Sequence, residues 1–518
     1  MDRRKGGEIA NIARELILLG TSNLAVDDLR IWCLDWLHKK GLFCPSESLD
    51  ELLEKFRFGI LLAILSDNLQ KLVDNKVAYL KLQAFDNNAF PLIQRPLKEY
   101  LAMIPESPVG NLLGFLYYPN KEGGGILKYF RYLGVGESLL LNFDKLLEID
   151  GWDSAHTVLV SGTSYAPGSS AFHIPIRPSL LLKSKSPTDP ILQGKFVFSP
   201  QLNEKGKHIT ISGVPQHKTE KAYREMAKAI TGLYPNFLDD RFEELKDLAQ
   251  QEPALWSDRE RILGVTGSYD QAEWIIQELR SRYPHPVGDV NAIQPLRRDA
   301  DNRDHLYPGL KRGEIDKVAE SIIQLLIGVL GAMERGHNPL NDEKKAAFGT
   351  ILFIKRPMPV PHDWDEVVKG LNSWALQQFE PNQPIHQYSS LQMQGDYFAR
   401  EAWIELMKLT SKTVYFSDLN RQERLALCAN QVVSIWQVIG IGVRGNVPIN
   451  VHWLDKSFAP QSADNNQDDE TSSLLVAIIK TLEFWMSSDT PWEVTIAREL
   501  WRIFLCLLKE TDFLVYDK

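Results

Sequence analysis

The stretch RILGVTGSYDQAEWIIQELRSRYP, residues 261–284, decides the fold class of this chain. Its first apolar run, residues 262–266, ends at the small polar turn Gly267–Ser268 and passes at once into a segment with apolar residues at helical spacing. A strand that runs directly into a helix is the βα unit of a parallel sheet. We therefore predict an α/β fold built around this unit.

Strand and helix patterns alternate on both sides of this unit. Short apolar runs predict strands near residues 158, 325, 352 and 450, and residues 194–213 predict two more strands around a Glu-Lys-Gly turn. The run 321–338 fits either a buried helix or a buried strand, and its Ile and Val content favours a strand. Helical patterns fill the intervals at 221–234, 240–251 and 363–379, with two long helices between Gly395 and Gly445.

The regions that flank this α/β layer have different compositions. Residues 1–150 place apolar residues at helical spacing and predict a mostly helical accessory region. The stretch SADNNQDDETSS, residues 462–473, is polar and acidic and predicts an exposed linker. Residues 474–518 predict a tail of two amphipathic helices that packs back on the body. The expected domains are thus 1–150, 151–461, the linker 462–473 and the tail 474–518.

Composition excludes several classes of protein. The 518 residues carry a net charge of −9, which excludes a strongly basic nucleic-acid binder but leaves a local basic groove possible. The four cysteines form no CxxC pair and have no histidine at zinc-ligand spacing, so we expect no metal site and reduced thiols. No signal peptide and no apolar run of about 20 residues is found, so we expect a cytoplasmic protein without a membrane partner.

The chain lacks the motifs with which α/β proteins usually hold nucleotides. There is no GxxxxGKS or GxxxxGKT loop, no GxGxxG after a strand, no GxSxG elbow and no HExxH helix. Since a phosphate loop supplies the backbone N–H groups and the lysine that hold the phosphates, we expect no ATP hydrolysis by this chain alone.

An ordered set of segments resembles the superfamily 2 helicases of the DinG-like and XPD-like branch. Residues 158–164, VLVSGTS, followed by Pro167-Gly168-Ser169 resemble the Ser-Ala-Thr coupling motif. Residues 264–272 are similar to the Thr-x-Ser-Tyr segment that opens the second RecA-like domain. Residues 333–338, MERGHN, with the Pro-rich strand end 353–361, resemble the segment that holds the Glu-Gly-Asp element.

The last two segments of this set follow in the same order. Residues 437–444, QVIGIGVR, fit the Gln-x-x-Gly-Arg-x-x-Arg motif except at Ile441, which stands where the first arginine is expected. Residues 455–459, DKSFA, resemble the Asp-Lys-Arg-Phe-Ala stretch. The RGHN sequence and the Pro-rich strand end also resemble the corresponding segments of the helicase-type proteins of prokaryotic Piwi-RE defence islands. The resemblance covers residues 157–460.

This resemblance implies the C-terminal half of a helicase, with a RecA-like lobe. It implies that ATP and Mg²⁺ are shared with a partner chain that carries the N-terminal motifs, and that single-stranded DNA is bound; Piwi-like defence proteins are further candidate partners. No iron–sulfur cluster is expected, because that cluster needs four cysteines in the accessory region and only Cys33 and Cys44 are present. The resemblance assigns catalytic roles to Gln437, Gly440 and Arg444. It assigns coupling and DNA-binding roles to Ser161, Thr163, Ser268 and Tyr269. It assigns cofactor-binding roles to Glu334, Arg335, Gly336 and His337.

Each of these roles has a structural alternative. A helix through Gln437, Gly440 and Arg444 places all three on one side, toward an ATP cleft, yet the same helix fits a core position with Arg444 capping its end. Ser268 fits an ordinary N-cap, and residues 334–338 fit a solvated loop. The alternative for the whole protein is a non-catalytic degenerate helicase scaffold or DNA clamp in a bacterial defence complex.

Overall fold

The computed structural model divides into two compact units, residues 1–106 with 388–399 and residues 107–387 with 400–518. From the first 106 residues it describes only 27, 30–32, 34–35 and 59. From residue 107 onward it describes the chain to residue 517 apart from 120–124, 146–147, 149–150, 154–155, 183–189, 233–235, 283–289, 302–304, 335, 360–363, 381 and 412–414. Cys33, Cys44 and Arg335 therefore lie outside the described residues. The elements below belong to the second unit, except for the first residues of α12.

The centre of the second unit is a seven-stranded sheet in which every strand pair is parallel. The strand order is β3-β9-β8-β4-β7-β5-β6. The bounds are β3 Phe196–Phe198, β4 Ile262–Thr266, β5 Ile293–Arg297, β6 Leu310–Lys311, β7 Leu325–Val329, β8 Thr350–Phe353 and β9 Asn450–Trp453. The predicted α/β class, with a RecA-like parallel-sheet lobe and a helical tail, is confirmed, and the run from residue 321 does contain a strand.

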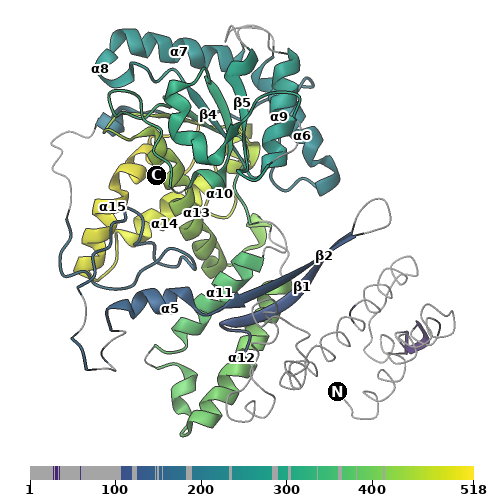
Figure 1. Cartoon of the computed structure of the whole chain (residues 1–518), viewed down its shortest axis with the longest axis vertical. Helices are drawn as coiled ribbons and strands as arrows, with labels where there is room; N and C mark the ends of the chain where they lie inside the picture. Colours follow the sequence, from purple (N-terminus) through teal and green to yellow (C-terminus); the bar gives the residue numbers. More distant parts are fainter. Residues whose placement is uncertain are drawn as a thin grey trace, which may run out of the picture. The chain divides into compact units, whose positions relative to one another are not determined.

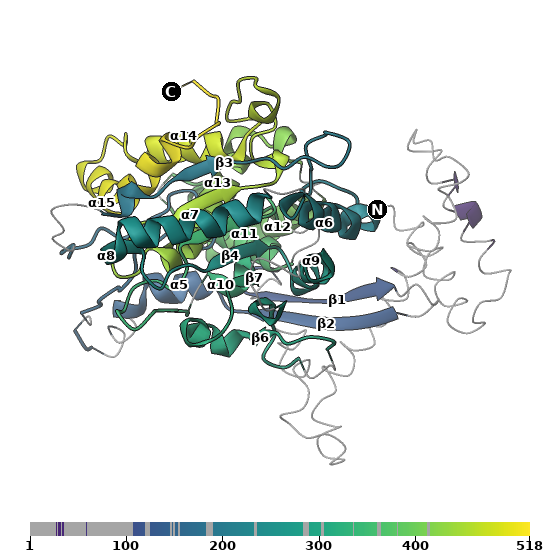
Figure 2. The ribbon, with the colours of Figure 1, turned by 90° about the horizontal axis from the view of Figure 1, so that it is seen from above.

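Helices cover both faces of this sheet (Figures 1 and 2). On one face, Ile262, Leu325 and Leu352 pack in a cluster with residues of α6 (Gln216–Ile230), α7 (Phe237–Gln251) and α9 (Tyr269–Arg282). On the other face, Leu263, Ile351 and Val451 pack with residues of α13 (Arg421–Gly442), α14 (Leu474–Trp485) and α15 (Pro491–Lys509). Every described strand of five residues in the sheet centre is fully buried, which is the pattern of a sheet covered on both faces.

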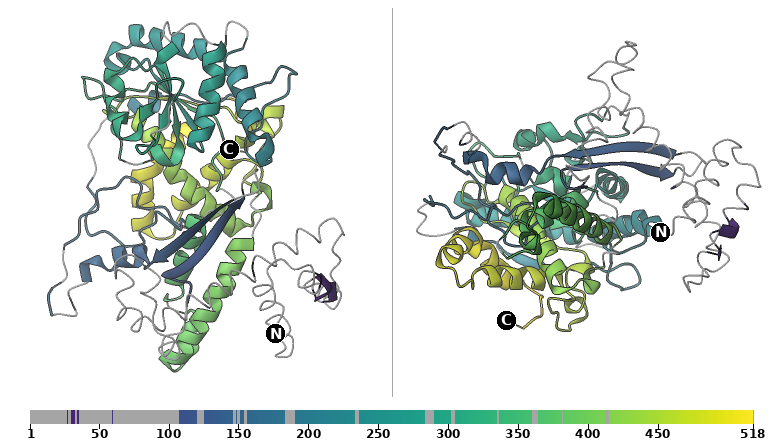
Figure 3. Two further views of the ribbon diagram at one scale, coloured as in Figure 1. Left: turned by 45° about the vertical axis from the view of Figure 1, so that its right-hand side comes forward. Right: turned by 90° about the horizontal axis from the view of Figure 1, so that it is seen from below.

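The helices have the following bounds. They are α5 Gly136–Leu141, α6 Gln216–Ile230, α7 Phe237–Gln251, α8 Pro253–Trp256, α9 Tyr269–Arg282, α10 Leu330–Met333, α11 Trp364–Gln377, α12 Leu391–Ser411, α13 Arg421–Gly442, α14 Leu474–Trp485 and α15 Pro491–Lys509. The two predicted tail helices are α14 and α15, and they pack on α13 and on each other as part of the same core (Figure 3).

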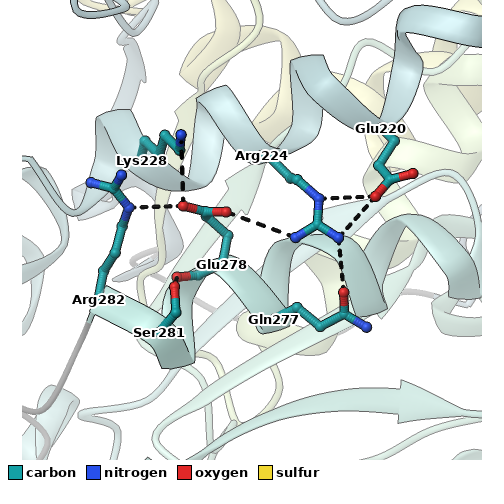
Figure 4. A network of polar contacts seen from close by, with 7 residues as sticks. All are labelled: Glu220, Arg224, Lys228, Gln277, Glu278, Ser281 and Arg282. Atoms are coloured by element: carbon teal, nitrogen blue, oxygen red, sulfur yellow. Dashed lines mark hydrogen bonds and ion pairs between the residues drawn. The ribbon is translucent and has the colours of Figure 1, made fainter.

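Charged side chains join α6 to α9 at the protein surface (Figure 4). The Glu278 carboxylate lies 2.8 Å from the Arg282 Nε, 3.8 Å from the Arg224 Nη1 and 3.9 Å from the Lys228 Nζ. Arg224 also binds Glu220 and the Gln277 Oε1. Because solvent screens such pairs, they add about 1 kcal/mol or less each, and the apolar contacts between the two helices dominate.

A single buried arginine joins the amino ends of the central strands to α13. Arg259 is fully buried, and its guanidinium donates hydrogen bonds of 2.8–3.1 Å to backbone carbonyls of Leu255, Ala346, Phe348, Gly442 and Pro448. Burial lowers the pKa of Arg259 to about 9, which leaves the side chain charged at neutral pH. Arg259 thereby supplies hydrogen-bond donors to backbone carbonyls that precede β8 and β9, where the chain is not paired with another strand.

Replacing Arg259 by leucine should destabilise the fold strongly. The substitution leaves several buried carbonyls without a donor, at about 1 kcal/mol or more each, so we expect the free energy of unfolding to fall by about 4 kcal/mol. Urea unfolding followed by circular dichroism measures this loss. Arg224→Leu, in the surface network, is the control and should cost less than about 1 kcal/mol. Equal losses of unfolding free energy for the two variants would show that the buried hydrogen bonds of Arg259 stabilise the fold no more than the surface contacts of Arg224 do.

The strand expected near residue 158 is absent from the structure. Residues 156–161 form no strand, and the Val158 and Val160 side chains are 80% and 95% exposed, because no described strand lies beside them to complete a ladder. The antiparallel hairpin of β1 (Asn111–Pro119) and β2 (Gly125–Leu133) was not predicted, and most of the region expected to be helical lies outside the described residues. Residue Leu112 of β1 packs with Leu371 of α11 and Leu406 of α12.

In the acidic stretch 462–473, residues 464–467 and 469–471 are exposed, as predicted, whereas 462, 463, 468 and 473 are buried. Asp468 is buried, and its carboxylate accepts hydrogen bonds from the backbone N–H groups of Gln461 and Ser462 and from the Ser472 hydroxyl. Ser473 is also buried and caps α14 by accepting from the Val476 N–H. The acidic residues therefore fold the chain into a connection that starts α14, because carboxylates compensate backbone donors that would otherwise lack partners.

Candidate functional site

The segment that resembles the coupling motif lies along helix α13. The Gln437 Nε2 donates to the Thr163 Oγ1 at 2.8 Å, and the Ser169 hydroxyl donates to the Asn430 Oδ1 at 2.6 Å. Asn430 also donates to the Ser170 Oγ at 3.2 Å. Since Asn430 and Gln437 are seven residues apart, they share one side of the helix. Two sequence motifs that are 274 residues apart are thus joined by a direct hydrogen bond.

The other side of this segment is held by the C-terminal helices. The Trp485 indole donates to the Pro167 carbonyl at 2.9 Å, and the Trp501 indole donates to the Tyr165 carbonyl at 2.7 Å. Burial lowers the pKa of His173 to about 4, so its ring is neutral at neutral pH and its Nδ1 accepts the Ala166 N–H at 3.3 Å. The segment is therefore fixed between α13 on one side and α14 and α15 on the other.

A pocket of about 420 Å³ opens beyond the carboxyl ends of β4, β7 and β8. The walls combine apolar side chains with amides, hydroxyls and charged groups; they include Phe172, Val265, Ser268, Leu330, Glu334, Phe353, Lys355, Met358, Glu366, Lys369, Asn430, Gln431 and Ser434. Open parallel sheets bind ligands at this edge, outside the carboxyl ends of the strands. Its position and mixed lining make this pocket the candidate binding site.

Lys355 is the charged side chain that follows β8. Among the described residues its ammonium has no hydrogen-bond or ion-pair partner, and burial lowers its pKa. The nearby Asp455 carboxylate is already used by four backbone N–H groups, from Ile211, Ser212, Arg356 and Ser457. In the DKSFA stretch, Asp455 therefore has a structural role, and its carboxylate also attracts the nearby Lys355 ammonium without forming a close ion pair with it.

Ser268 and Tyr269 stand at the start of α9, as predicted. Ser268 lines the pocket. Its Oγ also accepts a long hydrogen bond of 3.4 Å from the Gln271 N–H, so Ser268 caps the helix only weakly. The Arg298 guanidinium lies over the Tyr269 ring, 5.1 Å from its centroid. Tyr269 is therefore already stacked on a cation, whereas Ser268 faces the candidate site.

Residues 334–337 follow β7 and α10, as the sequence predicts, but they do not act together. Glu334 lines the pocket. Gly336 adopts a φ of +83°, a left-handed conformation that favours glycine. The His337 Nε2 lies 2.9 Å from the Ala332 carbonyl, so the histidine closes its own loop. Of the four predicted cofactor-binding residues, the structure brings only Glu334 to the pocket, and Arg335 is outside the described residues.

The predicted shared side of Gln437, Gly440 and Arg444 does not exist. Helix α13 ends at Gly442, and Arg444 follows in an exposed turn with Gly445 and Asn446 at positive φ. A Cβ at Gly440 would meet no atom within 4 Å, so packing does not require glycine there. Ile441 is 2% exposed and belongs to the main core.

Arg444 and the pocket lie at opposite edges of the sheet. The Arg444 carbonyl accepts the Ala346 N–H at 2.9 Å, and Ala346 precedes β8, whereas the pocket follows the ends of the strands. Ser161 lies in neither of these places. It is in an exposed turn, where its Oγ accepts the Thr163 N–H at 3.2 Å. The predicted residues therefore form two groups, Thr163 with Gln437 and Ser268 with Glu334, while Arg444 stands apart from both.

Lys355, Asn430 and Gln431 line the pocket but were not predicted as site residues. A usable signal was present for each. Lys355 is the first charge after the buried run TILF, at a strand end where ligands bind. In the apolar helix α13, the polar residues Asn430, Gln431, Ser434 and Gln437 recur at helical spacing, which marks a polar stripe on a buried helix.

No family model matches this chain, and no curated protein matches it. Within the described part of the chain, no three metal-ligating side chains come together. Among the described helices, α13 is long and apolar enough to cross a membrane, and 61% of its most apolar window is buried inside the fold, as in a core helix.

Proposed function

We propose that this chain is the second RecA-like lobe of a superfamily 2 DNA helicase, which binds single-stranded DNA and completes an ATP site with a partner chain. The observation that carries the proposal is the hydrogen bond between Thr163 and Gln437. The resemblance assigns these residues to two separate motifs, one for coupling and one for ATP. A chance resemblance gives no reason for the two motifs to meet, while a lobe that transmits ATP binding to DNA requires it.

The surroundings of Arg444 support a role toward a nucleotide held by another chain. Its side chain is exposed and has no hydrogen-bond or ion-pair partner among the described residues. A finger arginine supplied to a partner must be free in this way before the partner binds. In this proposal the partner contributes the phosphate loop and the Mg²⁺ ligands, the complex is cytoplasmic, and Piwi-like defence proteins are further candidate partners.

One observation favours the alternative of a non-catalytic scaffold. Ile441 occupies the position of the first finger arginine, and it is buried in the core. An arginine cannot point from this position into a cleft without moving the helix. A lobe with one arginine where the family has two is either a weak motor or a DNA clamp.

ATP turnover by the chain and by the reconstituted pair separates these functions. The purified chain alone should hydrolyse no ATP above background, because its sequence contains no phosphate loop to hold the β- and γ-phosphates. After addition of a chain with a phosphate loop, the proposal predicts turnover stimulated by single-stranded DNA. A pair that forms a stable complex, binds DNA and still hydrolyses no ATP would establish the scaffold instead.

A further inference from the structure

We propose that the pocket at the carboxyl ends of β4, β7 and β8 holds one whole nucleotide, with its phosphate at Lys355 and an amine-bearing edge of its base at Gln431. The inference rests on the proposed function, because it takes this nucleotide to be part of the bound single strand. It adds a base preference, which binding through backbone phosphates alone does not produce.

The phosphate position follows from two positive groups that meet at the wall of the pocket. The ammonium of Lys355 has no ion-pair partner among the described residues. A Cβ built on Gly267 would lie 3.5 Å from the Lys355 Nζ, so this ammonium stands at the start of α9. The amino end of a 14-residue helix carries a partial positive charge. The Asp455 carboxylate offsets part of this positive charge, and a bound phosphate gains contacts with both the ammonium and the helix start.

The second lysine of the pocket does not compete for this role. Lys369 of α11 already pairs with Glu366 at 2.7 Å, and both side chains line the pocket. Glu334 lies on the β7 side of the pocket. The carboxylates repel a phosphate placed near them, so the anion is favoured at Lys355, on the β8 side.

The apolar walls suit the sugar and base. Val265, Leu330 and Phe353 line the pocket near the sheet, and Met358 lies in the segment that follows β8. A volume of about 420 Å³ is within the range of pockets that take small organic ligands, roughly 300–1,000 Å³. A free inorganic phosphate would leave most of these apolar walls uncovered, whereas a nucleotide covers them.

The base preference follows from one unpartnered oxygen. The Gln431 Oε1 is buried and has no hydrogen-bond partner in the described structure. The neighbouring Asn430 amide is already occupied by Ser169 and Ser170. A buried acceptor without a donor is unfavourable, by about 1–3 kcal/mol. Adenine and cytosine carry an exocyclic amine that can donate to this oxygen, whereas thymine offers only its ring N3–H, which stands between two carbonyl oxygens that repel the Gln431 oxygen.

The test combines binding and labelling on the full chain. Anisotropy titrations with labelled dA, dC and dT oligonucleotides should show dA and dC binding about fivefold tighter than dT, and Gln431→Leu should remove that difference. Lys355→Gln should weaken all three about tenfold and lower the salt dependence by about one phosphate contact. Lys221→Gln, at a lysine that is 79% exposed on α6, is the control and should change neither quantity.

Labelling of Lys355 reports occupancy of the pocket directly. Pyridoxal phosphate with borohydride reduction should label Lys355, as read by peptide mass spectrometry, and oligo-dA should protect it. Protection by a free mononucleotide without any oligonucleotide binding would keep the nucleotide pocket and overturn the proposed function. Oligonucleotide binding that is indifferent to both pocket variants and leaves Lys355 unprotected would overturn the inference and keep the proposed function. Circular dichroism confirms that each variant is folded.

Discussion

Arg444→Ala should lower ATP turnover of the reconstituted pair by about 10³-fold while barely changing its affinity for ATP. Arg444 is the only arginine that the QVIGIGVR motif retains, and it is exposed beyond the end of α13. A finger arginine acts mainly on charge that develops on the γ-phosphate in the transition state, so its loss affects turnover more than binding. Steady-state turnover and nucleotide binding, measured on the same preparation, separate the two effects.

Arg421→Ala is the matched control for this prediction. Arg421 is an exposed arginine at the opposite end of the same helix, so its removal makes the same change in net charge. It should leave turnover within about twofold of the unmodified pair. If Arg444→Ala and Arg421→Ala have equal turnover in a folded complex, the exposed turn after α13 does not face an ATP site.

Ile441→Arg should unfold the lobe or destabilise it by about 5 kcal/mol or more. The sequence alone allows the opposite expectation, that an arginine here restores the second finger and raises turnover. In the structure Ile441 is 2% exposed in the core, so the substitution places an unpaired charge in an apolar environment. Urea unfolding, followed by circular dichroism, measures the loss.

Ile441→Val tests whether the site tolerates a small change. It removes one methylene group from the core and should cost only about 1 kcal/mol. If Ile441→Arg is as stable as Ile441→Val and raises the turnover of the pair, the helix opens toward a cleft and the buried position of Ile441 does not describe the working complex.

The βα units were predictable because their pattern is local. The stretch from Arg261 to Pro284 contains a buried strand, its polar turn and its helix within 24 residues, so no distant partner is needed to recognise it. The run at residues 158–160 has the same β-branched character but becomes a strand only if another strand lies beside it. Strand β5 was missed for the reverse reason, since Pro295 interrupts its apolar pattern while β7 still pairs with it.

The candidate site could be predicted only in part, because its members come from six separate segments. Glu334 was predicted from its place after a strand and Ser268 from its place at the start of a helix, and both residues line the pocket. Helical spacing failed for Arg444, because the sequence does not show that α13 ends at Gly442, two residues before it. Lys355 and Gln431 stand out only after their partners are known, since being unpaired is a property of the folded surroundings.

Binding of the purified full chain to single-stranded and duplex DNA across a salt titration tests the central claim most directly. The account predicts that the single strand binds at least about tenfold tighter than the duplex, and that affinity falls steeply as salt rises because phosphate contacts release counterions. The net charge of −9 predicts that this affinity is modest. Absence of binding at low salt, or equal affinity for both forms of DNA, would contradict the proposal that this chain is a lobe of a single-strand helicase.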